Sequence, residues 1–228
     1  MRIAQVAPLA EAVPPKLYGG TERIVSYLTE ELVAMGHEVT LFASGDSITS
    51  ANLEAVVPVA LRLDPESRDP VSPHVLAVTR VVDMLDQFDI VHFHIDHFQL
   101  PVMRERDTPY VTTFHGRLDL KELQPLMDAY PRAPFISISD SQRRPLKNVN
   151  WAGTILHGLP KDLLPYGEGE GGYLAFLGRI SPEKGPDAAI RIARAAGIPL
   201  KIAAKVDRAD KDYFDEVSRP MLDGPGVE

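Results

Sequence analysis

The stretch YGGTERIVSYLTEELVAMGHEVTLFAS, Tyr18 to Ser44, contains one helix followed directly by one strand. Apolar side chains recur at helical spacing along it, at Ile24, Val25, Leu28, Leu32 and Met35. Thr21 suits the N-cap before this helix, and Gly36 suits the position just after it. The segment HEVTLFAS that follows has the apolar content of a buried strand. A helix followed directly by such a strand is the repeating unit of a parallel α/β sheet.

The same alternation runs through most of the chain. The expected strands are RIAQVAP (2–8), NLEAVVPVAL (52–61), DIVHFH (89–94), PYVTTFHG (109–116), APFISIS (133–139) and WAGTILHGL (151–159). The expected helices are PHVLAVTRVVDMLDQF (73–88), LKELQPLMDAY (120–130) and a short broken one, DSQRRPLKN (140–148). This order predicts a Rossmann-like, doubly wound parallel sheet, which binds ligands at the carboxyl ends of its strands.

A second, shorter β/α series follows a change of composition. PKDLLPYGEGEGGY (160–173) is rich in Gly, Pro and Glu and is interpreted as a linker. After it come GYLAFLGRI (172–180), GPDAAIRIARAAG (185–197), LKIAAKV (200–206) and KDYFDEVSRPML (211–222). Two strands are too few for a sheet of useful size. We therefore predict a complete α/β domain over 1–165 and an incomplete second Rossmann-like domain over 166–228.

Charge and composition exclude several classes of protein. The 228 residues include 24 basic and 32 acidic side chains, a net charge of −8, which argues against a general nucleic-acid binder. There is no cysteine, so disulfides and thiolate sites are excluded and a cytoplasmic location is expected. Because the apolar runs are of strand length and interrupted by charge, no membrane span is predicted. Peripheral contact with a membrane stays open.

The stretch FLGRISPEKGPDAAI, Phe176 to Ile190, predicts an anion site. Gly185 and Pro186 open a helix whose free amides and positive dipole end attract negative charge. Arg179 and Lys184 would add two positive charges, a suitable pair for two linked phosphates. Taken alone, two exposed loop charges explain this pair equally well. Neither G-x-G-x-x-G after the first strand nor G-x-x-x-x-G-K-[ST] is present.

GRISPEKG resembles the signature G-R-x-x-x-x-K-G of the family 4 (group 1) retaining glycosyltransferases with the GT-B fold. YGGTERIVSYLTEELVAMGHEVTLFA, DIVHFH, VTTFHG, ISISDSQR and TILHGL resemble other landmarks of that family in the same order. The resemblance implies two Rossmann-like domains with a nucleotide-sugar in the cleft between them. Residues 1–165 would be the acceptor-side domain, and residues 166–228 would be part of the nucleotide-sugar domain.

The same resemblance implies roles for single residues. Gly19 and Gly20 match a glycine loop whose backbone closes on the donor phosphates and sugar, helped by the positive φ that glycine tolerates. His115 matches a catalytic histidine that hydrogen-bonds the donor sugar. Arg179 and Lys184 match the pair that stabilises the leaving nucleoside diphosphate. The implied reaction transfers a sugar from a nucleotide-sugar to an acceptor hydroxyl with retention, without a cofactor or metal.

Weaker signals surround these residues. HFHIDHF (92–98) invites a metal site, but zinc ligands are usually more widely spaced, so lining of the cleft or packing is favoured. His94 and Asp96, with Tyr18 beside the glycine loop, are acceptor-side candidates. SQRRPLK (141–147) fits a solvated helix face better than a site for a phosphate-bearing or lipid-linked acceptor. His157 and Pro160 stand where many family members have Asn and Asp, so the contacts there stay open.

The end of the sequence lacks one feature of the family. No pair of glutamates with the family's spacing follows Lys205, and GPGVE (224–228) resembles the entry to a further strand. We therefore expect a C-terminally truncated chain with little turnover of its own. It would be a fragment of a full enzyme, half of a split enzyme, or a non-catalytic sugar- or lipid-binding partner. A nucleotide-sugar epimerase or a phosphorylase is the alternative enzyme. The donor's base and sugar, the sugar, lipid or small-molecule acceptor, and self-association through the second domain are left open.

Overall fold

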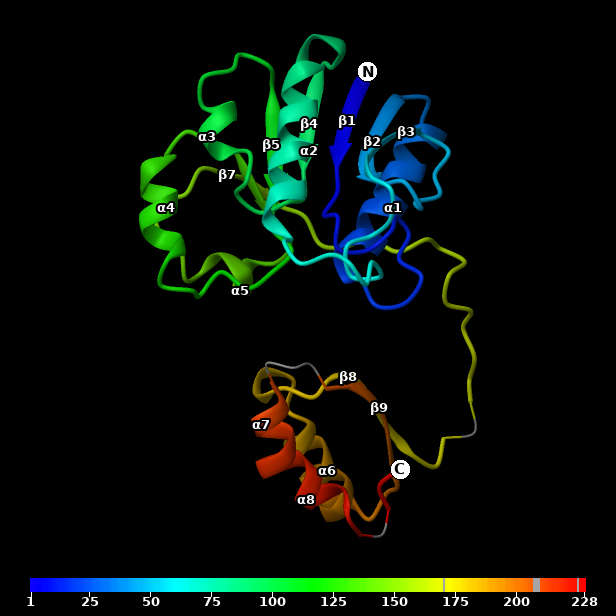
Figure 1. Cartoon of the computed structure of the whole chain (residues 1–228). Coiled ribbons are helices and arrows are strands. Elements are labelled where there is room, and N and C mark those ends of the chain that lie inside the picture. Colours follow the sequence, from blue (N-terminus) through cyan, green and yellow to red (C-terminus); the bar gives the residue numbers. More distant parts are fainter. Residues whose placement is uncertain (170, 207–209, 225) are drawn as a thin grey trace. The chain divides into compact units, whose positions relative to one another are not determined.

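Parallel strands form the centre of Met1–Leu164, the first of two compact units in the computed structural model (Figure 1). The structure describes residues 1–169, 171–206, 210–224 and 226–228. The strands of this unit 1 are β1 (Arg2–Val6), β2 (Glu38–Ser44), β3 (Asn52–Val57), β4 (Ile90–Phe93), β5 (Tyr110–Thr113), β6 (Phe135–Ser137) and β7 (Trp151–Thr154). They form a seven-stranded sheet in the order β3-β2-β1-β4-β5-β6-β7, with every neighbouring pair parallel. The predicted Rossmann-like fold is confirmed.

Helices connect these strands. They are α1 (Gly20–Ala34), α2 (Val71–Asp83) with a 3-10 turn at Leu85–Gln87, α3 (Leu100–Met103), α4 (Leu123–Ala129) and α5 (Asp140–Arg143). The predicted N-cap at Thr21 is wrong. The amide of Arg23 donates to the carbonyl of Gly19, so Gly19 is the cap and Thr21 lies inside the helix. Gly36, with φ 86°, follows the last turn of α1 as predicted.

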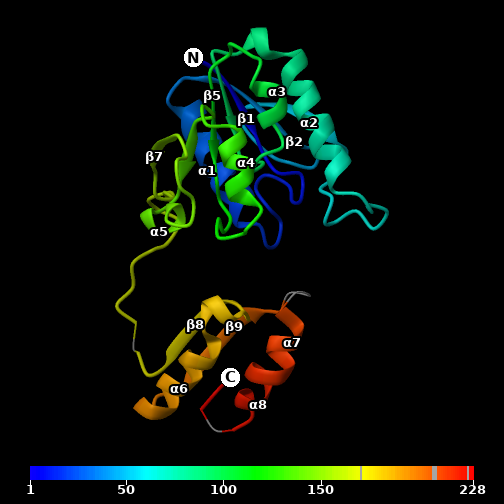
Figure 2. The ribbon, with the colours of Figure 1, turned by 90° about the vertical axis from the view of Figure 1, so that its left-hand side faces the viewer.

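The sheet packs differently on its two faces. Ala4 and Val6 of β1 face a large apolar cluster that includes Val78 of α2, whereas Ala7 faces a smaller cluster with Val25 of α1. Figure 2 shows α1 and α2 on opposite sides of the sheet. Because side chains alternate along a strand, the positions between the α2-facing residues point to the α1 side. Gln5, His92 and His94 are polar side chains on this side of the sheet.

The second unit, Pro165–Glu228, is built around two parallel strands, β8 (Leu174–Arg179) and β9 (Leu200–Lys205). Among the residues that the structure describes, its helical segments are a 3-10 turn (Pro182–Lys184), α6 (Pro186–Ala196), α7 (Lys211–Tyr213), a π-helical turn (Phe214–Ser218) and α8 (Arg219–Leu222). Ile190, Ala193 and Leu200 form the centre of its small core. On the other face of β8, the side chain of Leu177 is 88% exposed.

The end of the chain continues this sheet. The amide of Leu200 donates to the carbonyl of Gly226 at 2.7 Å, and that of Ile202 donates to the carbonyl of Glu228 at 2.7 Å. Val227 forms a parallel bridge with Leu200. The expected entry to a further strand is therefore seen as pairing along β9. Pro225 lies outside the described residues.

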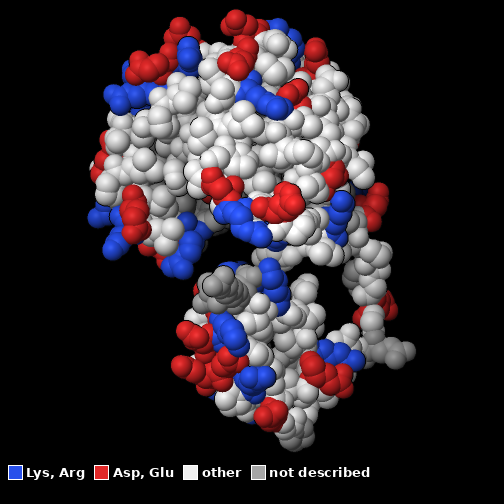
Figure 3. Space-filling view, viewed as in Figure 1, with Lys and Arg blue, Asp and Glu red and all other residues white. Residues whose placement is uncertain are grey.

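The segment interpreted as a linker carries no helix or strand at any residue that the structure describes between Thr154 and Leu174; residue 170 lies outside them. Among the described residues, no helix is both long enough and apolar enough to cross a membrane. On the face in Figure 3, acidic and basic side chains lie interspersed. This surface therefore has charges of both signs side by side.

Candidate active site at the carboxyl edge of the sheet

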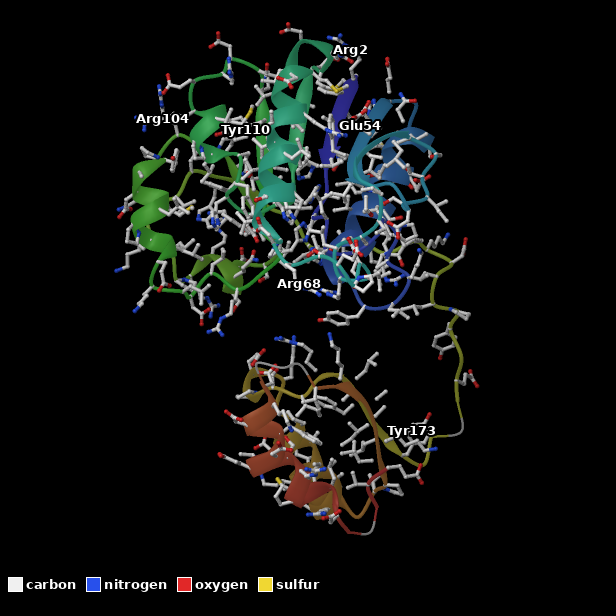
Figure 4. The ribbon with its side chains drawn as sticks, in the orientation of Figure 1. Arg2, Glu54, Arg68, Arg104, Tyr110 and Tyr173 are labelled. Atoms are coloured by element: carbon white, nitrogen blue, oxygen red, sulfur yellow. The ribbon has the colours of Figure 1, made fainter. Side chains whose placement is uncertain are left out.

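The predicted site residues of unit 1 gather at one edge of its sheet. Tyr18 and the glycine loop follow β1, His94 directly follows β4, and His115 lies just beyond β5. The segment after β7 brings His157 to the same edge. Arg2, labelled in Figure 4, marks the opposite edge, where it pairs with Asp89 at 2.8 Å. Carboxyl ends of parallel strands are where α/β sheets bind ligands, so the location agrees with a ligand site.

A continuous line of hydrogen bonds connects the histidines at this edge. Oε1 of Gln5 in β1 lies 2.8 Å from Nε2 of His94. Nδ1 of His94 lies 2.8 Å from Nε2 of His115. Nδ1 of His115 then lies 3.2 Å from Nε2 of His157. We call these four residues the histidine chain; Gln5 and His94 are its buried end, and His157 is its exposed end.

His92 lies beside the chain without belonging to it. Its Nε2 is 2.7 Å from Oγ1 of Thr113, and its ring centroid is 4.1 Å from that of His94. Because side chains alternate along a strand, His92 and His94 lie on the same side of β4, with their rings in contact and tilted by 37°. Each has its own hydrogen-bond partner.

Burial holds these imidazoles in their neutral form. It lowers the pKa of His92 to about 4, and it lowers the pKa of His115 to about 3 with help from nearby histidines. Burial, and then the neighbouring histidines, keep the pKa of His94 well below its ordinary value of 6.5. The pKa of His157 is also lowered by burial. At neutral pH each ring is therefore uncharged, with one donor and one acceptor nitrogen.

A cavity of about 700 Å³ opens beside the chain. Its walls come from the α1 side of the sheet, from α1 and from the segment after β7, and they include Ile3, Ile24, Leu28, Ile90, Val111, Ile136 and Leu159. His92, His94, His115 and His157 also line it. The cavity is thus mostly apolar with a polar edge. The sequence did not predict it, although the alternation of His92 and His94 with buried apolar residues was a signal.

The glycine loop departs from its expected backbone. Neither Gly19, with φ 177°, nor Gly20 has the positive φ that the sequence led us to expect. A Cβ on Gly19 would lie 2.8 Å from Cβ of Pro15 and 3.0 Å from Oε2 of Glu22. A Cβ on Gly20 would meet nothing within 4 Å. Gly19 is therefore required by the packing of its own loop, and Gly20 is open to solvent.

Acidic side chains surround the start of α1. Glu11 is 1% exposed and pairs with Nη1 of Arg62 at 2.7 Å, and the same Nη1 donates to the carbonyl of Tyr18 at 3.1 Å. Glu22 is 5% exposed. Burial raises its pKa, while the backbone amides of Glu22 and Glu11 and the charge of Arg62 act in the opposite direction. Two buried carboxylates make this helix start less favourable for a phosphate than its glycines alone predict.

The turn before α6 has the backbone that the sequence predicts. Pro186 is the first helical residue, and Gly185 is the cap, in the left-handed conformation at φ 67°. Nη2 of Arg179 pairs with Oε1 of Glu183 at 2.7 Å, and its Nη1 lies 3.7 Å from Oδ2 of Asp210. Lys184 is exposed. Both predicted cations therefore belong to the same turn, and Arg179 contacts two carboxylates.

The weaker candidates fall in different places. His94 is 3% exposed, and both of its ring nitrogens are used in the histidine chain, so an acceptor would reach it only after rearrangement. Asp96 is exposed in a turn with φ 57° and lies outside the chain. Tyr18 is 51% exposed. Within the part of the protein that the structure describes, no group of three or more His, Asp or Glu side chains could hold a metal ion, and HFHIDHF forms none.

Solved structures resemble the whole chain. AviGT4, a glycosyltransferase involved in avilamycin A biosynthesis, has 24% identity and a TM-score of 0.69, covering 100% of this chain and 62% of AviGT4. The catalytic domain of starch synthase IV from Arabidopsis thaliana, bound to ADP and acarbose, has 13% identity and a TM-score of 0.60, covering 100% and 73%. UDP-N-acetylglucosamine 2-epimerase from Rickettsia bellii has 11% identity and a TM-score of 0.55, covering 100% and 68%.

These likenesses concern the fold, which is that of the GT-B proteins. The chain spans less than two thirds of the length of AviGT4. A comparison with curated protein sequences finds no match. The family model of Glycosyltransferase Family 4 matches residues 18–152, more than half of the 228 residues. That segment includes the glycine loop, strands β2 to β6 and two members of the histidine chain, His94 and His115. The chain therefore belongs to Glycosyltransferase Family 4.

Proposed function

We propose that this protein takes part in retaining glycosyl transfer, moving a sugar from a nucleotide-sugar donor to the hydroxyl group of an acceptor. The observation that carries the proposal is the family match over residues 18–152, the segment that contains His94 and His115 of the histidine chain. In this proposal Met1–Leu164 is the acceptor-side domain, and Pro165–Glu228 belongs to the domain that binds the donor. The acceptor is a sugar, a lipid or a small molecule.

The turn before α6 holds the diphosphate of the donor. Arg179 supplies a forked donor and Lys184 a compact charge, and the free amides at the start of α6 add their partial charge. To bind phosphate oxygens, Arg179 exchanges its contact with Glu183, an exposed pair that contributes little to stability. The ADP in the starch synthase structure supports a nucleoside diphosphate as the ligand class. Charge on the leaving diphosphate is then stabilised by electrostatics, and no metal or cofactor is invoked.

His115 is the histidine of unit 1 that the proposal assigns to the reaction centre. It stands at the end of β5 beside the cavity, where its neutral ring joins the histidine chain through both nitrogens and brings no positive charge. Gly20 offers open backbone near the start of α1, whereas Gly19 is enclosed by its own loop. Tyr18 and Asp96 remain proposed acceptor contacts, because both are exposed to an incoming molecule.

Two other functions would use the same architecture. A nucleotide-sugar epimerase shares the fold, as the Rickettsia bellii enzyme illustrates, but the family match favours a transferase. A non-catalytic binding partner would hold the sugar or lipid without turnover. Incubation with a radiolabelled nucleotide-sugar separates the three. Label moves to an acceptor for a transferase, stays on an epimerised donor for an epimerase, and remains unchanged for a binding protein.

The phosphate site is tested by calorimetry with ADP and adenosine, and with UDP and uridine. Lys184→Ala should weaken diphosphate binding by about 1.5–3 kcal/mol, the usual contribution of a hydrogen bond to a charged group, and leave nucleoside binding unchanged. Lys211→Ala is the matched control, because Lys211 is a helix-surface lysine paired with Asp215 at 2.6 Å in the same unit. Equal losses of affinity for the diphosphate and for the nucleoside would show that Lys184 does not bind the phosphates.

A further inference from the structure

The histidine chain has a direction. It contains three hydrogen bonds, and each needs one proton. A neutral imidazole carries a single N–H, so a ring that accepts at one nitrogen must donate at the other. His94 and His115 each use both nitrogens within the chain. The direction of the bond at one end therefore fixes the direction of all three.

The carbonyl oxygen of Gln5 sets that direction. Oε1 can only accept, so His94 donates from Nε2 and keeps a bare Nδ1. That Nδ1 accepts from Nε2 of His115, whose own Nδ1 then accepts from Nε2 of His157. All protons point toward Gln5, which is 1% exposed. The last ring, His157, is left with a bare Nδ1 at the exposed end of the chain.

This arrangement leaves His115 with no nitrogen for a ligand. Its two ring nitrogens are engaged at 2.8 and 3.2 Å. His157, in contrast, is exposed, lines the cavity and uses only Nε2 in the chain. A ligand that enters the cavity therefore meets an acceptor nitrogen on His157 before it can reach His115.

We propose that His157 is the ligand-facing histidine of unit 1, that its Nδ1 accepts a hydrogen bond from a sugar hydroxyl group, and that His115, His94 and Gln5 are positioning residues that fix its tautomer. The hydroxyl-bearing ligand class rests on the proposed function. The direction of the chain does not, because it follows from the hydrogen bonds alone.

The histidine chain accepts a hydrogen bond from the hydroxyl group and does not remove its proton. A proton taken up at Nδ1 of His157 could move inward only by charging His115 or His94, which are buried next to each other and to the His92 ring. Burial holds the pKa of His115 near 3, so that charge is strongly disfavoured at neutral pH. Glu31 and Lys161 also line the cavity, without a hydrogen bond to any ring of the chain among the contacts described.

The direction is tested by ¹⁵N NMR of the histidine rings in the 228-residue protein at neutral pH. His94, His115 and His157 should each show a protonated Nε2 and a bare Nδ1. A protonated Nδ1 on any of the three overturns the proposal, whatever the activity of the protein. If the rings show the expected pattern but the protein does not bind a nucleoside diphosphate, only the proposed function is contradicted.

A pair of variants tests the anchor. Gln5→Met keeps the side-chain length but removes the strong acceptor, so the three rings should lose their single tautomer while circular dichroism stays unchanged. Thr113→Val is the matched control, because Thr113 contacts His92 outside the chain. It should alter the His92 signal alone. An unchanged pattern in Gln5→Met would overturn the positioning role, and the wild-type spectrum decides the direction even where this variant folds poorly.

The ligand-facing role is tested with D-glucose as the probe. During a titration the Nδ1 signal of His157 should shift most, and His157→Phe, which keeps an aromatic ring, should lower the affinity for glucose several-fold. Two outcomes overturn the role. The largest shift at Nδ1 of His115 would mean that the sugar displaces His157, and no shift at either ring would mean that the chain does not face the sugar.

Discussion

The turn before α1 and the turn before α6 both place glycine at a helix start, yet their surroundings differ in charge. Two buried carboxylates, Glu11 and Glu22, lie at the first, with Arg62 as the counter-charge. At the second, Arg179 and Lys184 precede the glycine, and the carboxylates that Arg179 contacts are those of Glu183, whose side chain is 52% exposed, and Asp210. A helix start offers the same amides and dipole in either case. The neighbouring side chains, and not the glycine, therefore decide whether the amides are available to a phosphate.

The glycines themselves are needed for different reasons. Gly19 has an extended backbone that any residue adopts, and only its contacts with Pro15 and Glu22 exclude a side chain. Gly185 has φ 67°, where L-residues are strained, but a Cβ there would make only an ordinary contact with Ala188 at 3.7 Å. One glycine is therefore fixed by packing, the other by conformation.

Substitution of Gly19 should have the largest effect on stability. Gly19→Ala places a Cβ 2.8 Å from the buried ring of Pro15, an overpacking that should cost about 1–3 kcal/mol in the free energy of unfolding. Gly20→Ala is the control. It meets open space and should stabilise by about 0.4–1 kcal/mol, because alanine restricts the unfolded chain. Urea unfolding measures both. Equal midpoints for the two variants would contradict a packing requirement at Gly19.

Gly185 should come next. Gly185→Ala forces an L-residue into the left-handed region, which costs roughly 1–2 kcal/mol. Gly185→Asn is the matched variant, because asparagine tolerates this conformation better, and it should lose less than alanine. Thermal unfolding of the two variants tests the order. If alanine proved no worse than asparagine, the strain argument would fail and the difference from Gly19 would need another cause.

A smaller effect is expected at Glu22, through pH. Burial raises its folded-state pKa above the ordinary 4.5, so the folded protein holds this proton more tightly than the unfolded chain. Stability from Glu22 is therefore fully present below the unfolded pKa and is lost as pH rises through the folded-state pKa. Glu22→Gln should flatten that decline in urea midpoints recorded upward from acid pH. A decline of the same size in the variant would assign the pH dependence to other groups.

The helix α1 and the turn before α6 could be predicted from the sequence because their determinants are local. The apolar spacing in Ile24–Met35 acts within α1, so this helix was predictable. Gly185 and Pro186 are neighbours in the sequence, so the start of α6 was predictable as well. Thr21 was misplaced because the Gly19 carbonyl begins the hydrogen-bond pattern earlier than a capping hydroxyl would. The site depends on more than local spacing.

The histidine chain could be predicted only in part. Each member follows or lies in a strand, and the carboxyl edge was the expected place for His94 and His115. Their mutual contact, however, requires that β4 and β5 be neighbours. The bond between Gln5 and His94 joins residues 89 positions apart, because β1 lies next to β4 in the sheet. Strand order is a property of the whole sheet, and no spacing along the sequence encodes it.

The smallest effect on stability, and the sharpest contrast between the turns, is expected from Glu183. It is 52% exposed at its side chain and pairs with Arg179 at 2.7 Å, so Glu183→Gln should change the free energy of unfolding by about 0–1 kcal/mol. The same change releases Arg179 from one competing carboxylate, and affinity for ADP or UDP should rise.

Asp215→Asn, which breaks a surface pair with Lys211 elsewhere in the unit, should leave that affinity unchanged. Calorimetry at low and at high salt measures both variants, and the gain should shrink at high salt because salt screens exposed charges. An unaltered affinity in Glu183→Gln would mean that Arg179 does not contact the phosphates, and the turn before α6 would then hold anions no better than the acidic turn before α1.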